Sequence, residues 1–492
     1  MAKNKTASSS SYGGLKLNYK RTAIIGFAFF GILLLWQIYD SWCPTFLTEL
    51  FRGASYPKFD LFTPEEQDYA TRQVQYLVGI VMALDNLAAL ILLPLFGKLS
   101  DKTKTPLGKR MPYILVGTLV CAVAFPFIPV FFHMHNIAGT IAMMAIVVVF
   151  AMMYRNPAVA LMPDVTPKPL RSKANGVINI MGYIGGALGT ALGIPFAISQ
   201  YLGTEINKDG TPKAHTWAFN NVWAIEIPFL IGSILMVISA VVLFIKVREN
   251  EVAAEMAEDM RKGDEIAETV DKVEEDKPMT KANLRMLILI LVAEFFWFMA
   301  DNGIATFMVN FTTYYLNASS SSAMINTIVG GVGSVVGFAL GGYIAGKIGR
   351  KWSVVIGLAA TLGVYVLWAI LTLSINMQGS GTFPFWIYAV WFIKGFGMSL
   401  VFVNSFPMVV DLCPNSKIGL FTGYYYASSM AAQTVTPIAL GTLLFIPNFG
   451  WQYLPLYATA CSAIALVIVL LLKNVHGKTK IKMGLEAFDA EE

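Results

Sequence analysis

Residues 97–110 read GKLSDKTKTPLGKR and place five basic side chains within fourteen positions. The stretch lies between two apolar runs, in a chain of 492 residues that is 56% hydrophobic and only 14% charged. A soluble domain carries about 25% charged residues. A short basic loop between long apolar segments is typical of an integral membrane protein, in which Lys and Arg keep a loop in the cytoplasm.

Twelve apolar runs in this chain are long enough to cross a bilayer, because a helix needs about 20 apolar residues to span the hydrocarbon core. The predicted fold class is therefore an all-α membrane protein with twelve transmembrane helices. The expected spans are 22–48, 72–97, 111–132, 137–163, 175–201, 222–246, 284–315, 324–346, 352–375, 383–410, 418–445 and 451–472.

The basic residues collect in alternate loops. The N-terminal tail and the loops after the second, fourth and eighth spans are basic, whereas the loops after the seventh, ninth and eleventh spans carry no charge. The positive-inside rule then predicts a multi-pass protein of the cell membrane with both termini in the cytoplasm.

A long polar stretch divides the spans into six and six. The expected segments are an N-terminal tail (1–21), a six-helix bundle (22–247), a charged linker (248–283), a second six-helix bundle (284–473) and a C-terminal tail (474–492). The linker is acidic with alternating charge, which favours a solvated cytoplasmic connector or surface helix. A regulatory role is the alternative.

The two halves share an internal repeat. GKLSDKTKTPLGKR (97–110) matches GYIAGKIGRK (342–351), and DVTP (164–167) matches DLCP (411–414) at an offset of 247. Gly176 and Gly423 match at that same offset. Two six-helix halves of repeated character are typical of a transporter whose binding site lies between them.

The basic loop also contains the candidate residues of a cytoplasmic gating motif. Its glycines allow tight turns, and its charges can form a network that latches the halves in one state. A plain topogenic loop is the alternative. The candidates are Gly97, Asp101, Gly108, Lys109, Arg110, Asp164 and Arg171.

The pattern G-x-x-x-D-K to G-K-R at 97–110 resembles the signature loop of the major facilitator superfamily, and the six-plus-six layout fits that superfamily along the whole chain. Five residues, 103–107, separate Asp101-Lys102 from Gly108. This long spacing within the loop resembles the loop of the glycoside–pentoside–hexuronide:cation symporters and of the related sucrose-transporter-like branch. NPAVALMPD (156–164) and FFWFMADNGIATF (295–307) also resemble that second branch. The resemblance implies proton symport with a sugar or glycoside.

One departure from the resemblance concerns the coupling ion. The melibiose-permease type carries two Asp on its second span, in the pattern D-x-x-x-D-P-x-x-G. The equivalent run here is ALILLPLFG, in which Ala89 and Leu93 replace both acids while Pro94 and Gly97 remain. The sodium site of that type is therefore in doubt, and both protons and sodium stay open as coupling ions.

Ionisable residues inside the predicted spans are expensive, at about 2.5–3.5 kcal/mol each on insertion scales. Four carboxylates are candidates for proton coupling, and two basic residues are their candidate cation partners. Arg155 is expected to pair with Asp85 or Glu294, and Lys394 with Asp301. Purely structural ion pairs are the alternative. The set is Asp40, Asp85, Glu294 and Asp301, with Arg155 and Lys394.

Aromatic and amide side chains in the spans suit a sugar, since a ring packs on an aromatic face and its hydroxyl groups bond to amides and hydroxyls. Bonds between helices are the commoner role of a polar residue inside a membrane. The candidate substrate-binding residues are Trp36, Gln37, Tyr39, Asn156, Trp297, Asn302, Asn404 and Gln433.

The function expected from these features is sugar or glycoside:proton symport by alternating access, with a disaccharide as the expected size of substrate. A sodium-coupled sugar symporter and an efflux antiporter of another small solute are the alternatives. No catalytic motif or metal-ligand spacing is present in the sequence, so neither an enzyme nor a cofactor is expected. The expected partners are the sugar and the lipid bilayer, without nucleic acid, and one chain is expected to be functional.

Overall fold

The computed structural model describes residues 15–207, 209–213, 224–271, 279–414, 417–446 and 449–473. Within these ranges the chain is helical, apart from turns, loops and an isolated bridge between Ile206 and Pro212. Most of the N-terminal tail, the whole C-terminal tail and residues 272–278 of the predicted linker lie outside the described residues.

The first half of the chain packs its helices into one bundle. Its apolar segments begin at defined caps, such as Asn136, whose side chain accepts a hydrogen bond from the backbone N–H of Gly139. The helices are α1 (Tyr19–Ser55), α2 (Pro64–Gln73), α3 (Gln75–Lys102), α4 (Met111–Ala124), α5 (Phe127–His133), α6 (Ile137–Asp164), α7 (Arg171–Leu192), α8 (Ile198–Leu202) and α9 (Ile227–Lys246).

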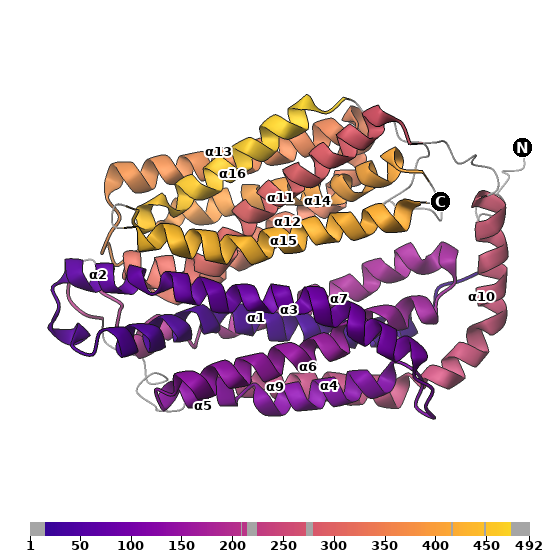
Figure 1. The fold of residues 1–492 in the computed structure, drawn as a ribbon, viewed down its shortest axis with the longest axis horizontal. Coiled ribbons are helices and arrows are strands. Elements are labelled where there is room, and N and C mark those ends of the chain that lie inside the picture. The colour runs from indigo at the N-terminus through magenta and orange to yellow at the C-terminus, as the bar shows by residue number, and fades with distance from the viewer. Residues whose placement is uncertain are drawn as a thin grey trace, which may run out of the picture.

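The second half forms another bundle, preceded by α10 (Glu249–Asp271). Figure 1 shows the two bundles side by side along their length, with α10 across one end of the first. The helices of the second bundle are α11 (Lys281–Asn310), α12 (Ser320–Ile348), α13 (Arg350–Ile375), α14 (Phe385–Leu412), α15 (Ile418–Phe445) and α16 (Leu454–Leu471).

Ten helical stretches of the described chain are long and apolar enough to cross a membrane. Two further helices, α7 with 22 residues and α15 with 28, also have sufficient length at about 1.5 Å per residue. Both lie beside the opposite bundle, because α7 contacts α12 and α15 contacts α3. Together these helices confirm the predicted all-α membrane fold with twelve spans.

The packing repeats between the bundles. In the first bundle α1 packs on α7 and α9, and in the second α11 packs on α15 and α16. The matched acids of the repeat have matched partners, because Arg110 before α4 pairs with Asp164 on α6, and Arg350 on α13 pairs with Asp411 on α14. The sequence repeat is therefore a repeat of helix packing.

The two ends of the molecule differ in character. We call the end with residues 97–110 and α10 the basic end, and the opposite one, where α1 and α11 finish, the far end. At the basic end, the Glu249 carboxylate accepts hydrogen bonds from the backbone N–H groups of Lys109, Arg110 and Met111, at 2.9–3.1 Å. Helix α10 is thus fastened to the first bundle.

Candidate functional site

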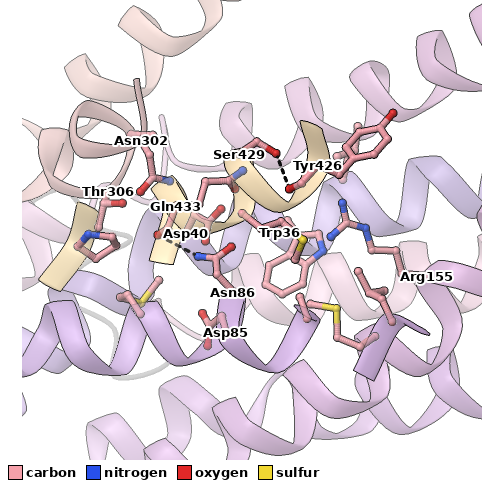
Figure 2. Close-up of a pocket in the computed structure, with 18 residues that line it drawn as sticks. Trp36, Asp40, Asp85, Asn86, Arg155, Asn302, Thr306, Tyr426, Ser429 and Gln433 are labelled. Atoms are coloured by element: carbon pink, nitrogen blue, oxygen red, sulfur yellow. Dashed lines mark hydrogen bonds between the residues drawn. The ribbon is translucent and has the colours of Figure 1, made fainter. Parts of the chain in front are cut away.

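A cavity of about 570 Å³ lies between the bundles, and we call it lobe 1. It is lined by α1, α3 and α6 of the first bundle and by α11 and α15 of the second. Its volume is in the range of cavities that bind small molecules. Figure 2 shows polar and aromatic side chains around it, namely Trp36, Asp40, Asp85, Asn86, Arg155, Asn302, Thr306, Tyr426, Ser429 and Gln433.

A second cavity of about 270 Å³, lobe 2, lies between α1, α11, α12 and α14. Asp40 and Ala305 line both lobes, so the two cavities adjoin at these residues. The polar and aromatic residues of lobe 2 are Gln37, Asp40, Ser41, Asp301, Thr327, Ser334, Trp391, Lys394 and Phe402.

One ion pair faces lobe 2. The Lys394 ammonium on α14 donates a hydrogen bond to the Asp301 carboxylate on α11, and both side chains remain partly accessible. Each charge offsets the cost of placing the other at this depth.

The charges of lobe 1 are arranged differently. Asp40 and Asp85 line the lobe together with Arg155, yet none of the three forms an ion pair among the described residues. The expected pairing of Arg155 with Asp85 or Glu294 is therefore not formed in this conformation. Figure 2 shows Arg155 beside Trp36, with Asp40 near Gln433. Lobe 1 thus offers both signs of charge to a ligand.

Three of the candidate residues are buried away from both lobes. Glu294 on α11 is 0% exposed, and neither of its carboxylate oxygens has a hydrogen-bond partner in the described part of the chain. Trp297 belongs to the apolar core of the second bundle, and Tyr39 to the core around the first.

Two of the candidate amides bond to helices instead of lining a lobe. Asn404 donates to the Ser353 hydroxyl at 3.0 Å and to the Leu400 carbonyl at 2.8 Å. Asn156 donates to the Leu93 carbonyl at 2.5 Å. In this conformation both amides join or brace helices. By contrast, the other candidate substrate-binding residues line a lobe, namely Trp36, Gln37, Asn302 and Gln433.

The predicted candidate sets omit four polar or aromatic residues that line lobe 1, namely Asn86, Thr306, Tyr426 and Ser429. The signal for the last three is helical spacing. Thr306 follows Asn302 by four positions, while Tyr426, Ser429 and Gln433 recur at three and four positions on α15. Residues at such spacing share a helix face. The face is recognisable only once one of its members is known to line a cavity.

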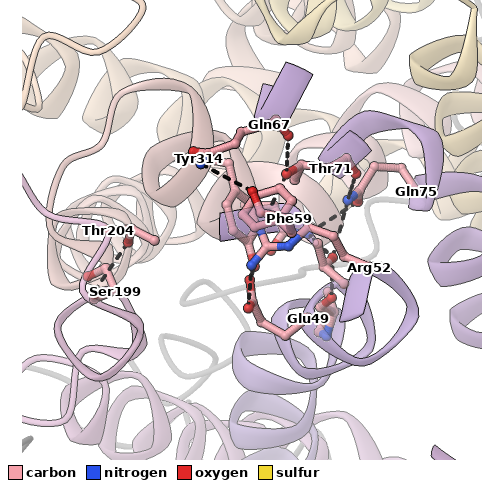
Figure 3. Close-up of polar contacts among 12 residues, drawn as sticks. Glu49, Arg52, Phe59, Gln67, Thr71, Gln75, Ser199, Thr204 and Tyr314 are labelled. Atoms are coloured by element: carbon pink, nitrogen blue, oxygen red, sulfur yellow. Dashed lines mark hydrogen bonds and ion pairs between the residues drawn. The ribbon is translucent and has the colours of Figure 1, made fainter. Parts of the chain in front are cut away.

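The bundles are joined at the far end by a buried polar network. Asn310 on α11 is 0% exposed, donates to Thr48 and Gln75 at 3.1 and 3.3 Å, and accepts from Thr45 at 2.8 Å. Tyr314 donates to Glu49 at 2.7 Å across the same boundary, as Figure 3 shows. These bonds close the far end of the interface.

Close backbone contact adds to this closure. A Cβ atom built on Gly79 of α3 would lie 2.1 Å from the Pro437 carbonyl oxygen of α15, and one on Gly441 would lie 2.4 Å from the Gln75 carbonyl oxygen. Only glycine fits such distances, so α3 and α15 meet backbone to backbone. Helices α7 and α12, which correspond to them in the repeat, contact each other much less.

The predicted gating motif forms a charge network at the basic end. The Arg110 guanidinium binds Asp101 at 2.5 Å and Asp164 at 2.8 Å, and Lys109 binds Asp164 at 3.1 Å. Burial opposes the charged form of Arg110, but these carboxylates outweigh that effect and raise its pKa. These carboxylates belong to the first bundle, so among the described residues the side-chain network braces one bundle and does not latch the two together.

Three other motif residues have local roles. Arg171 donates to the Thr166 and Pro163 carbonyls at 3.1 and 2.9 Å, where it supports the turn after α6. Gly108 has a positive φ of 109°, which favours glycine, and the Glu249 carboxylate lies against it. A Cβ on Gly97 would lie 2.5 Å from the Asn156 amide, so this glycine permits close approach of α3 and α6.

Several solved transporter structures are similar to this chain. A D-xylose–proton symporter has a TM-score of 0.63 at 14% identity, covering 94% of this chain and 100% of that one. The xylose transporter XylE from E. coli, in a partially occluded inward open conformation, has 0.60 at 13%, covering 93% and 99%. An inward-facing bacterial homologue of the iron transporter ferroportin has 0.61 at 13%, covering 92% and 99%. At these identities the likeness shows the fold.

No curated protein sequence matches the chain. The sequence pattern of the family described as MFS/sugar transport protein matches residues 71–449, which is most of the chain. This match covers the second span through the eleventh and both lobes of the cavity, apart from the residues on α1. The chain belongs to the MFS/sugar transport protein family, whose members are membrane transporters.

Proposed function

We propose that this protein is a secondary active transporter that carries a sugar or glycoside together with protons by alternating access. The observation that carries the proposal is lobe 1, a cavity between two repeated bundles in which two carboxylates and an arginine lie beside Trp36 and several amides. An aromatic face packs against a sugar ring, and amides bond to its hydroxyl groups. Family membership supports a sugar as the substrate class.

The closed far end supports an inward-facing state. If the basic end is cytoplasmic, as the Lys and Arg of its loops predict, the network of Asn310 and Tyr314 closes the outer side of the interface. The return step then requires these bonds to break and the basic ends of the bundles to come together. In that step, the charges around Arg110 are placed to change partners.

Asp40 is our first candidate for the proton-carrying carboxylate. It lines both lobes and is therefore within reach of a ligand in either one. Asp85 lines lobe 1, Asp301 is held by Lys394, and Glu294 is enclosed in the second bundle. Ala89 and Leu93 also line lobe 1. These positions, acidic in the melibiose-permease type, supply no carboxylate here, which favours protons over sodium.

The test is uptake into proteoliposomes that contain the purified chain. A panel of mono- and disaccharides is first screened by counterflow, and uphill uptake is then driven by a proton or a sodium gradient. One proton at 100 mV supplies about 2.3 kcal/mol, enough for about a 50-fold gradient of sugar. Stimulation by sodium alone would favour the sodium-coupled alternative, and outward movement driven by protons would favour efflux.

The variant Asp40→Asn separates binding from coupling. We expect it to retain counterflow and to lose accumulation against a gradient, because an amide cannot carry the proton. Asp60→Asn, at an exposed carboxylate in the loop after α1, is the matched control. Normal accumulation by Asp40→Asn would exclude Asp40 as the coupling residue, and Asp301 and Asp85 would be tested next.

A further inference from the structure

Lobe 2 contains an unequal number of positive and negative groups. Asp40 on α1, Asp301 on α11 and Lys394 on α14 all line it. The Lys394 ammonium binds the Asp301 carboxylate, whereas Asp40 is exposed and forms no ion pair among the described residues. Two carboxylates therefore line one small cavity with a single ammonium, which can fully compensate only one of them at a time.

The dimensions of lobe 2 suit the movement of a side chain better than the binding of a sugar. Its volume of about 270 Å³ is slightly below the size at which ordinary small-molecule sites begin, about 300 Å³. Gly331 lines it, and a Cβ atom built on this glycine meets no heavy atom within 4 Å, so the lobe has free space. A lysine carries its compact charge and three donors on a flexible four-carbon stem, which allows Lys394 to change its acceptor.

A charged carboxylate inside a protein is costly unless a cation or a proton compensates it. While Lys394 is bound to Asp301, Asp40 lacks a cation, and a proton is the alternative that removes its charge. If Lys394 binds Asp40 instead, the charged form of Asp40 is stabilised and its proton is released. The position of one ammonium thus decides whether Asp40 carries a proton.

From this arrangement we infer that Lys394 is a positioning residue for the proton of Asp40 and exchanges between the Asp301 and Asp40 carboxylates. On release, the O–H bond of Asp40 breaks, its electron pair stays on the carboxylate, the proton passes to water, and Lys394 moves to Asp40. On loading, Asp40 takes a proton from water and Lys394 returns to Asp301. This inference rests on the proposed proton-coupled transport and adds the group that controls the proton.

Other titratable groups surround this set of three and stay the same in all the variants below. Those near Asp40 belong to lobe 1 or to the buried core around α1. Tyr365 on α13 is buried beside Trp391, which lines lobe 2 near Asp301. The groups near Asp40 are Asp85, Arg155, Tyr426, Tyr39 and Cys43.

The experiment measures the proton on Asp40 directly and needs no sugar. Dicyclohexylcarbodiimide reacts with protonated carboxyl groups in apolar surroundings, and mass spectrometry of the Asp40 peptide gives the modified fraction. The reaction is run over a range of pH on the purified full-length chain in proteoliposomes. The result is the pH at which Asp40 reacts at half its maximal rate, which we call the midpoint of Asp40.

The exchange predicts shifts of opposite sign for the two members of the ion pair. Asp301→Asn leaves Lys394 free to bind Asp40 and should lower the midpoint, whereas Lys394→Gln removes the cation and leaves a second carboxylate, and should raise it. A charge at about 4–6 Å changes the proton affinity of a carboxylate by about 1–3 pH units, so we expect each shift to be about one unit. The double variant Asp301→Asn/Lys394→Gln should lie between the two, and Lys394→Arg should stay near the wild type.

Matched controls remove the same charges outside both lobes. Lys347→Gln removes an exposed lysine of α12 that lies over the ring of Tyr343, and Asp60→Asn removes an exposed carboxylate of the loop after α1. Both should leave the midpoint of Asp40 unchanged. If Lys394→Gln does not fold, the comparison of Asp301→Asn with the double variant still tests the exchange, because the lowered midpoint must rise again when Lys394 is also removed.

Two outcomes would overturn the inference. In one, Asp301→Asn leaves the midpoint at the wild-type value; in the other, Asp301→Asn and Lys394→Gln shift it in the same direction. Either result would leave Asp301 and Lys394 as a purely structural pair, and sugar uptake by the wild type would still support the proposed function. Opposite shifts in a protein that transports no sugar would instead reject the proposed function, so the two failures are distinguishable.

Discussion

The Tyr314 hydroxyl donates a hydrogen bond to the Glu49 carboxylate at 2.7 Å and thereby joins the second bundle to the first at the far end. Glu49 is also bound by Arg52 at 2.5 Å, so its charge is already compensated within the first bundle. The bond from Tyr314 is thus the part of this contact that joins the two bundles, and it must break when the far end opens.

Tyr314→Phe should shift the protein toward the state that is open at the far end. A hydrogen bond to a charged group contributes about 1.5–3 kcal/mol, which corresponds to roughly a 10- to 100-fold change in the ratio of states. The measurement is the rate at which a polar maleimide labels Ala305→Cys from the far side. The four native cysteines are buried and should give little background.

Tyr69→Phe on α2 serves as the control for this labelling, because Tyr69 is exposed at the far end. Equal labelling rates in the two variants would show that the Tyr314 bond does not hold the far end closed.

The Asp301–Lys394 pair should show strong coupling between its members. Lys394→Ala leaves the Asp301 carboxylate without its cation. Breaking a fully buried pair costs about 3–5 kcal/mol of stability, and we expect a smaller loss here because both side chains are partly accessible. The double variant Asp301→Asn/Lys394→Ala should regain much of that loss, because no lone charge remains. Thermal unfolding in detergent measures both. If the stability lost in the double variant equals the sum of the losses in the two single variants, the pair contributes little.

Glu249 should control the docking of α10. Its carboxylate accepts from three successive backbone N–H groups before and at the start of α4, where the helix dipole also favours a negative charge. Glu249→Gln should therefore loosen α10 and speed tryptic cleavage at the exposed Arg261 several-fold.

The neighbouring Glu251→Gln provides the comparison, because Glu251 pairs with the exposed Arg248, and such exposed pairs contribute about 0–1 kcal/mol. If both variants are cleaved at the wild-type rate, the hydrogen bonds to the Glu249 carboxylate do not hold α10 in place.

Glu226 should make stability depend on pH. It lies just before α9, is 7% exposed, and burial raises its pKa to about 7. The folded protein therefore holds this proton more tightly than the unfolded chain, whose Glu titrates near 4.3. Its contribution to stability is complete below the unfolded pKa and is lost as the pH rises toward 7.

The prediction for Glu226→Gln is a flatter dependence of melting temperature on pH between about 4.5 and 7, with a higher melting temperature than the wild type at pH 8. Glu65→Gln, at an exposed carboxylate on α2, should keep the wild-type slope. A slope unchanged by Glu226→Gln would assign the pH dependence to other groups.

The sequence by itself determined the twelve spans and the repeat of two bundles. Apolar length and the order of charges are local properties, so a run such as 137–163 predicts α6 without knowledge of its neighbours. The match of Asp164 with Asp411 also came from the sequence, and the structure pairs each of them with an arginine. The sequence likewise predicted the pairing of Lys394 with Asp301, which the structure forms.

Only the tertiary structure decided which polar side chains share a cavity. Depth follows from counting residues, but the direction that a side chain faces depends on the rotation of its helix and on the contacts between bundles. Glu294 and Asp301 lie seven residues, or about two turns, apart and so on one face of α11. Even so, Glu294 is enclosed in the second bundle and Asp301 faces lobe 2, so the surroundings at each height decide as well. Asp40 lines both lobes because α1 and α11 are in contact near it. That contact joins residues more than 200 positions apart in the chain, so the sequence pattern does not reveal it.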